Sequence, residues 1–185
     1  LYVTHSAEEL ARLASHLVVL GDGVVRASGP VTEVLASVSA PVVVGEDAGV
    51  LLQGALAGRD TDWHLARVDV GGHAFWLRDP GPAVPVGRAV RLRVLARDVS
   101  LARQRPLDSS IQNSLPAVVD GIGDDAHPAQ ALVRLRLRMQ RQEPPGHDAT
   151  GPVLLARVTR RALHQLDIGP GAAVWAQVKS VALVP

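Results

Sequence analysis

The side chains of this chain that could do chemistry are hydrogen-bond donors in two stretches, residues 110–119 and 153–184. They are Ser110, Gln112 and Asn113 in the first stretch, and Thr159, Arg160, Lys179 and Ser180 in the second. Hydroxyl, amide and cationic groups suit a tetrahedral oxyanion, which needs several converging donors and at least one full positive charge. A transition-metal ion would instead require imidazole, thiolate or carboxylate ligands. The residue types therefore favour an oxyanion site over a metal site.

Each of these residues also has an ordinary structural explanation. Ser110 and Asn113 are common turn formers, and Thr159 can cap a helix. A lysine within an apolar strand, such as Lys179, is usually a surface charge whose alkyl stem lies along the protein. Residue types alone leave both interpretations open.

Other kinds of chemistry lack their residues in the sequence. Cysteine is absent, and the seven histidines show no metal-ligand spacing. There is no Gly-x-Ser-x-Gly motif, no carboxylate dyad and no phosphate-binding Gly-x-x-x-x-Gly-Lys-Ser/Thr loop, so we expect no ATP hydrolysis by this chain alone. A formal charge of +1 and 3% aromatic residues provide neither a basic groove nor stacking rings, so no nucleic-acid partner is expected.

The elements that must position the donors can be predicted from residues 153–184. Both ends of this stretch are rich in β-branched and small apolar residues, which predicts two strands. Leu163 and Leu166 have helical spacing, so one short helical turn and a Gly-Pro-Gly break at residues 169–171 should separate the strands. Thr159 should end the first strand and cap the turn. Lys179 and Ser180 should lie well inside the second strand.

This strand–turn–strand unit resembles the C-terminal half of a molybdate-binding, or Mop, domain, and residues 110–119 resemble its start. Mop domains are β-barrel modules found in molybdenum-storage proteins and at the end of the ATP-binding subunits of molybdate importers. The resemblance implies that the seven donors bind molybdate or tungstate, helped by the backbone amides of Arg160 and Arg161. It also implies sites between paired modules, and therefore a homodimer.

The sequence departs from the Mop pattern at one donor position. Mop proteins commonly have an arginine where this chain has Gln112, so one charge-assisted hydrogen bond is lost. The Ser-Ile-Gln-Asn form resembles the variant seen in the transporter subunits.

The first 40 residues predict a small α/β unit. Residues 1–4 should be the tail of a buried strand, and Ser6 with Glu9 should form a capping box at the start of a helix. Leu10, Leu13 and Leu17 should form the apolar stripe of that helix.

A second apolar strand, a Gly-Asp-Gly turn, a third strand and a short helix opened by Gly29-Pro30 should complete the unit. This order, with His5 directly after the first strand, resembles the end of an ABC-transporter nucleotide-binding domain. The resemblance implies that His5 is the switch histidine that contacts the γ-phosphate of ATP, only in an intact subunit that also binds ATP and Mg²⁺.

From about residue 41, short strand-like runs alternate with Gly, Pro and Asp, which favours small β-barrels. The runs are residues 42–44, 49–56, 65–70, 74–77 and 89–96. Residues 91–101 resemble the linker strand of transport-associated oligosaccharide-binding (OB) domains of ABC ATPases. Residues 131–139 alternate strictly and should form a strand whose outer face, carrying Arg134, Arg136 and Arg138, is either solvated or bound to an acidic partner. Residues 142–152 should form a polar loop.

The sequence thus predicts a mainly β protein with two small OB-like (TOBE/Mop) barrel lobes, residues 41–106 and 107–185, after an ABC ATPase remnant at residues 1–40. The resemblance implies the dimeric, oxyanion-binding regulatory domain of a molybdate importer subunit, held at the cytoplasmic face of the membrane by a permease. Two alternatives stay open. The domain could be a dimerisation scaffold whose site is degenerate because of Gln112, or it could serve an importer of sugars or other solutes.

Overall fold

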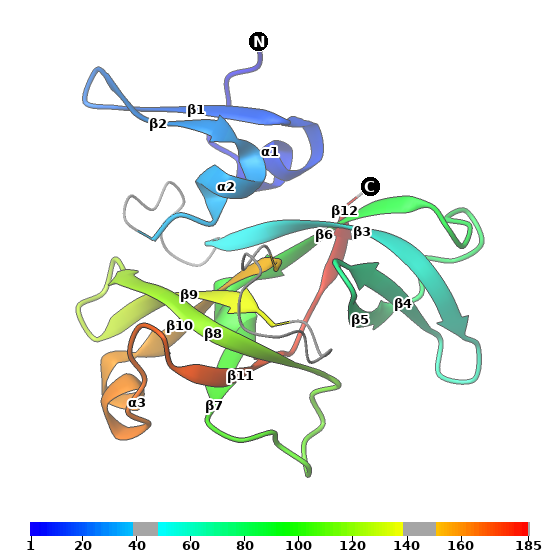
Figure 1. Ribbon diagram of the computed structural model, residues 1–185. Coiled ribbons are helices and arrows are strands. Elements are labelled where there is room, and N and C mark those ends of the chain that lie inside the picture. The colour runs from blue at the N-terminus through cyan, green and yellow to red at the C-terminus, as the bar shows by residue number, and fades with distance from the viewer. Residues whose placement is uncertain (39–47, 139–150, 185) are drawn as a thin grey trace.

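The computed structural model describes residues 1–38, 48–138 and 151–184. Figure 1 shows a small α/β unit next to a larger body made of two curved β-sheets. The α/β unit contains α1 (Ala7–Leu13), β1 (His16–Gly21), β2 (Val24–Pro30) and α2 (Val31–Leu35). The mainly β fold with two small lobes, predicted from the sequence, is confirmed.

The first helix begins as the capping residues predict. The Ser6 Oγ accepts a hydrogen bond from the Glu9 backbone N–H at 3.3 Å. The Glu9 carboxylate bonds the Thr4 hydroxyl, however, and the Ser6 N–H donates to the Thr4 Oγ1 at 3.0 Å. Only half of the predicted capping box therefore forms, because Thr4 takes the place of the reciprocal partner.

Two predictions for the α/β unit are wrong. Residues 1–4 are not a strand, and Leu1 and Val3 are exposed, because no described strand lies beside them. Leu17 lies in β1 and not on the first helix, which ends at Leu13. The residue that α1 buries is Ala11, whereas Leu13 is exposed.

The two sheets of the body each contain five strands. The first sheet has the order β12-β6-β3-β4-β5. Its strands are β12 (Ala182–Val184), β6 (Ala89–Leu95), β3 (Gly49–Asp60), β4 (Leu65–Val70) and β5 (His73–Arg78). The second sheet has the order β10-β9-β8-β11-β7. Its strands are β10 (Val153–Thr159), β9 (Gln130–Leu137), β8 (Asn113–Asp124), β11 (Ala173–Val178) and β7 (Val99–Ala102), with α3 (Arg160–Gln165) after β10 and a 3-10 turn, η2 (Ala96–Asp98), before β7.

The chain folds twice into the same arrangement. Strands β3 to β7 form the first repeat, and strands β8 to β12 form the second. In both, a 12-residue strand, β3 or β8, pairs on one side with the next strand of the chain and on the other side with the fourth strand of its repeat. Both long strands carry an irregularity in mid-strand, after Leu56 and after Val119. The repeats also exchange their last strands, since β7 pairs with β11 and β12 pairs with β6. Both exchanges cross the proposed boundary between residues 106 and 107, which stays a prediction.

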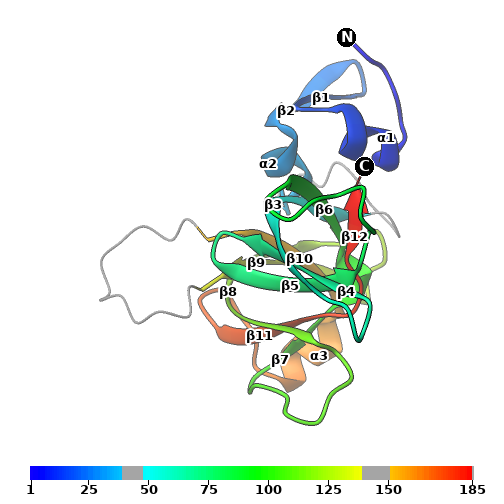
Figure 2. The same cartoon turned by 90° about the vertical axis from the view of Figure 1, so that its right-hand side faces the viewer.

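One apolar core joins the two repeats. The buried side chains include Leu56, Phe75 and Leu92 from the first sheet and Leu132 and Leu154 from the second, all in one continuous cluster. A smaller cluster joins the α/β unit to the first sheet through its buried members Ala11, Val31 and Leu51. Figure 2 shows α2 near β3, with the C-terminal strand β12 returning toward the same unit.

The strand runs predicted from residue 49 onward lie in β3, β4, β5 and β6. The alternating strand forms as β9, and its Arg134 and Arg136 pair with Asp120 of β8 at 3.3 and 2.7 Å, while Arg138 is exposed. The predicted strand at residues 42–44, the side chain of Met139 and residues 142–150 of the predicted loop lie outside the described residues.

Candidate oxyanion-binding site

One end of the second sheet collects most of the predicted donors. The first residue of β8, Asn113, lies opposite Val178, the last residue of β11. Gln112 and Lys179 therefore lie immediately beyond this last pair, where the two antiparallel strands end side by side. The Gln177 Nε2 donates to the Ser109 Oγ at 3.3 Å and ties the chain before β8 to β11. We call this region, Ser109–Asn113 with Gln177–Ser180, the donor end.

The structure corrects the position of Lys179 and Ser180. They were expected well inside the last strand, but β11 ends at Val178 and both residues lie in the connection to β12. The chain turns here because it must leave the second sheet to join the first. The Lys179 backbone N–H donates to the Asp98 carbonyl at 2.8 Å, which fixes the start of the connection and leaves the side chain at the surface.

Four side chains at the donor end are available to a ligand. Ser110, Gln112, Lys179 and Ser180 are exposed. Within residues 1–38, 48–138 and 151–184, none of these four side chains has a hydrogen bond or an ion pair. An ammonium group, two hydroxyls and an amide with no competing acceptor are a donor set that suits an oxyanion.

Asn113 differs from the other donors, because it is buried and its amide is in use. Only 6% of the residue is exposed. Its Oδ1 accepts from the Trp76 backbone N–H at 2.7 Å, and its Nδ2 donates to the Trp76 carbonyl at 2.8 Å. The side chain thus connects β8 to β5 of the other sheet.

The remaining predicted donors lie at the opposite end of the second sheet. Thr159 is the last residue of β10 and pairs with Gln130, the first residue of β9, whereas the donor end lies at the start of β8. Along β8 this separation corresponds to about 40 Å of strand, at roughly 3.3 Å per residue. Figure 1 likewise shows α3 beside the start of β11 and away from its end. One chain therefore does not bring all seven predicted residues together.

Thr159 caps α3 as predicted, and its Oγ1 accepts from the Ala162 N–H at 3.1 Å. The hydroxyl proton remains available for donation. More of the hydrogen-bond donors of Arg160 already have partners than expected. Its backbone N–H donates to the Ala129 carbonyl at 2.9 Å, its Nε donates to the Pro128 carbonyl at 3.1 Å, and its guanidinium pairs with Asp124. The backbone amide of Arg160 is thus not free for a ligand.

The loop that holds Arg160 is itself anchored inside the protein. Asp125 pairs with Arg157 of β10 at 2.5 Å, and their side chains are only 2% and 6% exposed. This buried pair fixes the connection from β8 to β9 against β10, and therefore the position from which Thr159 and α3 start.

His5, the predicted switch histidine, lies exposed in the segment before α1. It belongs to the α/β unit and not to the donor end.

The residues that sequence reasoning missed are Ser109, Gln177 and Asp98, which hold the donor end together. Their contacts join residues 68 and 81 positions apart in the chain, so no local pattern could have revealed them.

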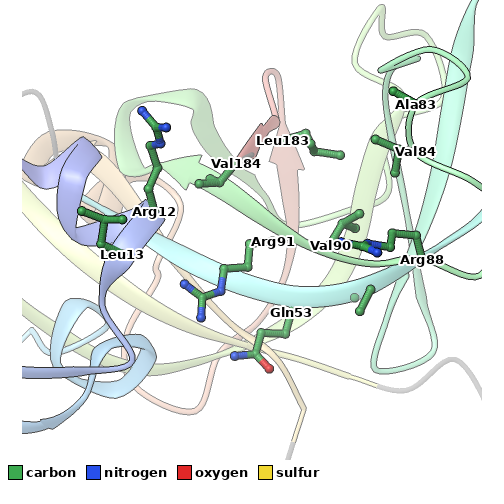
Figure 3. Close-up of a pocket in the computed structure, with 12 residues that line it drawn as sticks. Arg12, Leu13, Gln53, Ala83, Val84, Arg88, Val90, Arg91, Leu183 and Val184 are labelled. Atoms are coloured by element: carbon green, nitrogen blue, oxygen red, sulfur yellow. The ribbon is translucent and has the colours of Figure 1, made fainter.

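A separate cavity of about 600 Å³ lies between α1 and the first sheet (Figure 3). Arg12, Arg88 and Arg91 line it, but their guanidinium groups point in different directions. Arg91 donates to the carbonyls of Ala11 and Ala14 at 3.4 and 3.3 Å. The cavity is therefore part of the junction between the α/β unit and the sheets and lacks convergent donors.

Two further kinds of site were sought in the part of the chain that the structure describes. It contains no group of three or more histidine or acidic side chains that could hold a metal ion. No helix there has the length and apolar character needed to cross a membrane.

Comparison with known proteins shows which sequences and folds this chain resembles. Residues 109–184 match the TOBE domain. The chain is 50% identical over 184 residues to the molybdenum import ATP-binding protein ModC of Methylococcus capsulatus, covering 100% of this chain and 48% of that protein. It is 48% identical over 184 residues to ModC of Thiobacillus denitrificans, covering 100% of this chain and 47% of the relative. The chain thus spans about half the length of these relatives.

Among solved structures, the cytoplasmic molybdate-binding protein ModG with molybdate bound has a similar fold. The TM-score is 0.53 at 25% sequence identity, and the match covers 73% of this chain and 95% of ModG. This chain is therefore homologous, over its whole length, to the C-terminal region of the molybdenum import ATP-binding proteins ModC, and its residues 109–184 form a TOBE domain.

Proposed function

We propose that this chain binds molybdate or tungstate and acts as the regulatory region of an importer's ATP-binding subunit. The observation that carries the proposal is the donor end, where Ser110, Gln112, Lys179 and Ser180 lie exposed with no partner among the described residues. A dianion leaving water needs several directed donors and a positive charge, and this group supplies both. The similarity to ModG, solved with molybdate bound, supports the choice of ligand.

We further propose that each site is completed by a second copy of the chain. Thr159 lies at the other end of the sheet from Lys179, so one chain offers two half-sites that face different directions. In a twofold dimer the donor end of one protomer meets the Thr159 end of its partner, and the reverse contact forms as well. Arg160 contributes through its placement of α3 more than through its own donors, since its backbone N–H is bonded to Ala129 and its guanidinium is already bonded to Asp124 and Pro128.

Gln112 sets the strength of the proposed site. An amide donates a neutral hydrogen bond where an arginine would donate charge-assisted ones, so Lys179 carries the only full charge at the donor end. This arrangement favours an affinity low enough for the occupancy of the site to follow changes in oxyanion concentration.

In the whole subunit we propose that ATP and Mg²⁺ are bound in the region that the ModC relatives have beyond the matched half, with His5 as switch histidine. A membrane permease would hold the subunit at the cytoplasmic face. Oxyanion bound between two regulatory regions would then favour one spacing of the ATP-binding domains. Such coupling requires different oxyanion affinities in the two conformations of the subunit.

The test is a calorimetric titration of this chain with sodium molybdate and sodium tungstate, with sulfate, phosphate and maltose as controls. The proposal expects saturable heat for the first two ligands and light scattering that gives the mass of a dimer. A dimer without heat would support the scaffold function. Heat with maltose alone would support a sugar importer.

A further inference from the structure

The environment of Asn113 assigns it a different task from its neighbours. It is the first residue of β8, only 6% of the residue is exposed, and both ends of its amide are bonded to a single residue, Trp76. The oxygen and one N–H of a side-chain amide lie side by side, so together they can pair with the N–H and the carbonyl of one strand residue, as a neighbouring strand would.

The partner of Asn113 is the free edge of the first sheet. Among the residues that the structure describes, β5 is the edge strand of that sheet and pairs there with β4 alone. Trp76 lies opposite Arg67 of β4, and its N–H and carbonyl point to the other side, where Asn113 receives them. Without this contact the edge would present two backbone groups with no partner, which is unfavourable where such groups stay buried.

The backbone of Asn113 belongs at the same time to the donor end. It pairs with Val178 of the adjacent strand. Gln112 directly precedes Asn113 in the chain, and Lys179 directly follows Val178. The contact with Trp76 thus fixes the first sheet to the residues on both sides of the proposed oxyanion site.

The equivalent place in the first repeat has no such contact. There Gly49, the first residue of β3, pairs with Leu95, the last residue of β6. A Cβ atom on Gly49 would lie 2.4 Å from the Val94 carbonyl oxygen, so no side chain fits. The position equivalent to Lys179 is Ala96, which is buried. The amide contact therefore occurs only in the repeat that carries the donors.

We propose that Asn113 is a positioning residue, which latches β5 of the first sheet to the donor end and holds Gln112 and Lys179 in place without contacting the oxyanion. This inference rests on the proposed function for its ligand, but the latch itself can be tested without ligand. Two readouts separate the latch from the proposed function. Hydrogen exchange at the Trp76 amide reports on the latch, and the affinity for molybdate reports on the proposed function.

The experiment compares the wild-type chain with Asn113→Ala and with Gln53→Ala. Gln53 is an exposed residue of the first sheet with no side-chain partner among the described residues, so it controls for the loss of an amide. In the absence of ligand, the Trp76 amide should exchange at least tenfold faster in Asn113→Ala and at the wild-type rate in Gln53→Ala. Unchanged exchange in Asn113→Ala would overturn the latch.

Adding sodium molybdate distinguishes a latch from a ligand. If Asn113 turns its amide from Trp76 to the oxyanion, exchange at the Trp76 amide will accelerate when molybdate is added to the wild type. The latch predicts equal or slower exchange, together with about tenfold weaker molybdate binding by Asn113→Ala and unchanged binding by Gln53→Ala. Acceleration in the wild type, or wild-type affinity in Asn113→Ala, would overturn the proposal. Absence of binding by the wild type would instead contradict the proposed function and leave the exchange result to judge the latch.

Discussion

Lys179 is the single residue on which the oxyanion proposal depends most. It is the only lysine of the chain, and its backbone is fixed by the bond to the Asp98 carbonyl while its ammonium stays exposed. The other cation among the predicted donors, Arg160, already pairs with Asp124. Lys179 therefore supplies charge to a ligand without first breaking an internal pair.

Replacing Lys179 with alanine should weaken molybdate binding about ten- to a hundredfold, since a hydrogen bond to a charged group contributes about 1.5–3 kcal/mol. Calorimetric titration measures the change. Arg67→Ala is the matched control, because it removes one positive charge from an exposed position in β4. Its affinity should stay close to the wild-type value. Equal affinity of Lys179→Ala and the wild type would remove Lys179 from the site.

The burial of His73 predicts that the folded protein loses stability at low pH. It is 3% exposed, its Nε2 has no partner among the described residues, and burial lowers its pKa although Asp69 acts in the opposite direction. The unfolded chain therefore takes up this proton at a higher pH than the folded one. Stability should be complete above the ordinary histidine pKa of about 6.5 and should fall as the pH drops toward the folded-state pKa.

Urea unfolding between pH 5 and 8 tests this prediction. One group can contribute at most about 1.4 kcal/mol per pH unit to the slope. His73→Gln should have a smaller slope than the wild type in this range, whereas His164→Gln, at an exposed position of α3, should retain the wild-type slope. Identical slopes for all three proteins would show that His73 does not titrate in this way.

At the scale of elements, the repeats differ most between their third and fourth strands. The second repeat has α3 there, and the first has a loop after β5 that is held by Arg59. The Arg59 Nε donates to both Asp79 oxygens at 3.0 and 3.1 Å, and its Nη2 donates to the Gly81 carbonyl at 2.8 Å. The pKa of Asp79 is lowered first by the Gly81 N–H and then by Arg59.

Arg59→Ala should therefore raise the pKa of Asp79 only part of the way to that of an ordinary aspartate, because the Gly81 N–H remains. An NMR titration of the Asp79 carboxyl carbon measures this value. Arg67→Ala, which changes the same charge on the neighbouring strand, should leave it unchanged. A complete return to the ordinary pKa would mean that Arg59 also holds the loop conformation that brings Gly81 to Asp79.

The sequence predicted these elements well where its signal was local. Strict alternation predicted β9, and a short strand-like run before a turn signal predicted β4. Thr159 with the spacing of Leu163 and Leu166 predicted the capped turn after β10. It failed where distant contacts decide. Lys179 lies in an apolar run that looks like one strand, but the run is divided because β12 leaves to complete the other sheet. The apolar residues of the two strands are alike, so the sequence contains no mark of this exchange.

For the candidate site, the sequence predicted a set of residues but not their geometry. The resemblance named Ser110, Thr159 and Lys179 together, although a single chain places Thr159 at the far end of the sheet. Asn113 was expected to be a donor to the ligand, and its contact with Trp76, 37 residues away, could not be inferred from a local pattern.

In the whole molecule, Thr159 and the donor end lie at opposite ends of one sheet, and this gives a test of the proposed assembly. If each site joins the donor end of one protomer to the Thr159 end of its partner, Lys179→Ala and Thr159→Ala damage different halves. A mixed dimer then has one site in which both halves are damaged and one in which both are intact. Each variant alone should bind molybdate weakly.

Unfolding the two variants together and refolding them as an equal mixture should restore tight binding to about a quarter of all sites, because half of the dimers are mixed and each regains one of two sites. Calorimetry measures the stoichiometry, and the same treatment of each variant alone is the control. If both residues instead served one site within a protomer, mixing would restore no tight binding. The appearance of tight sites only after mixing would thus require the partner chain to supply Thr159.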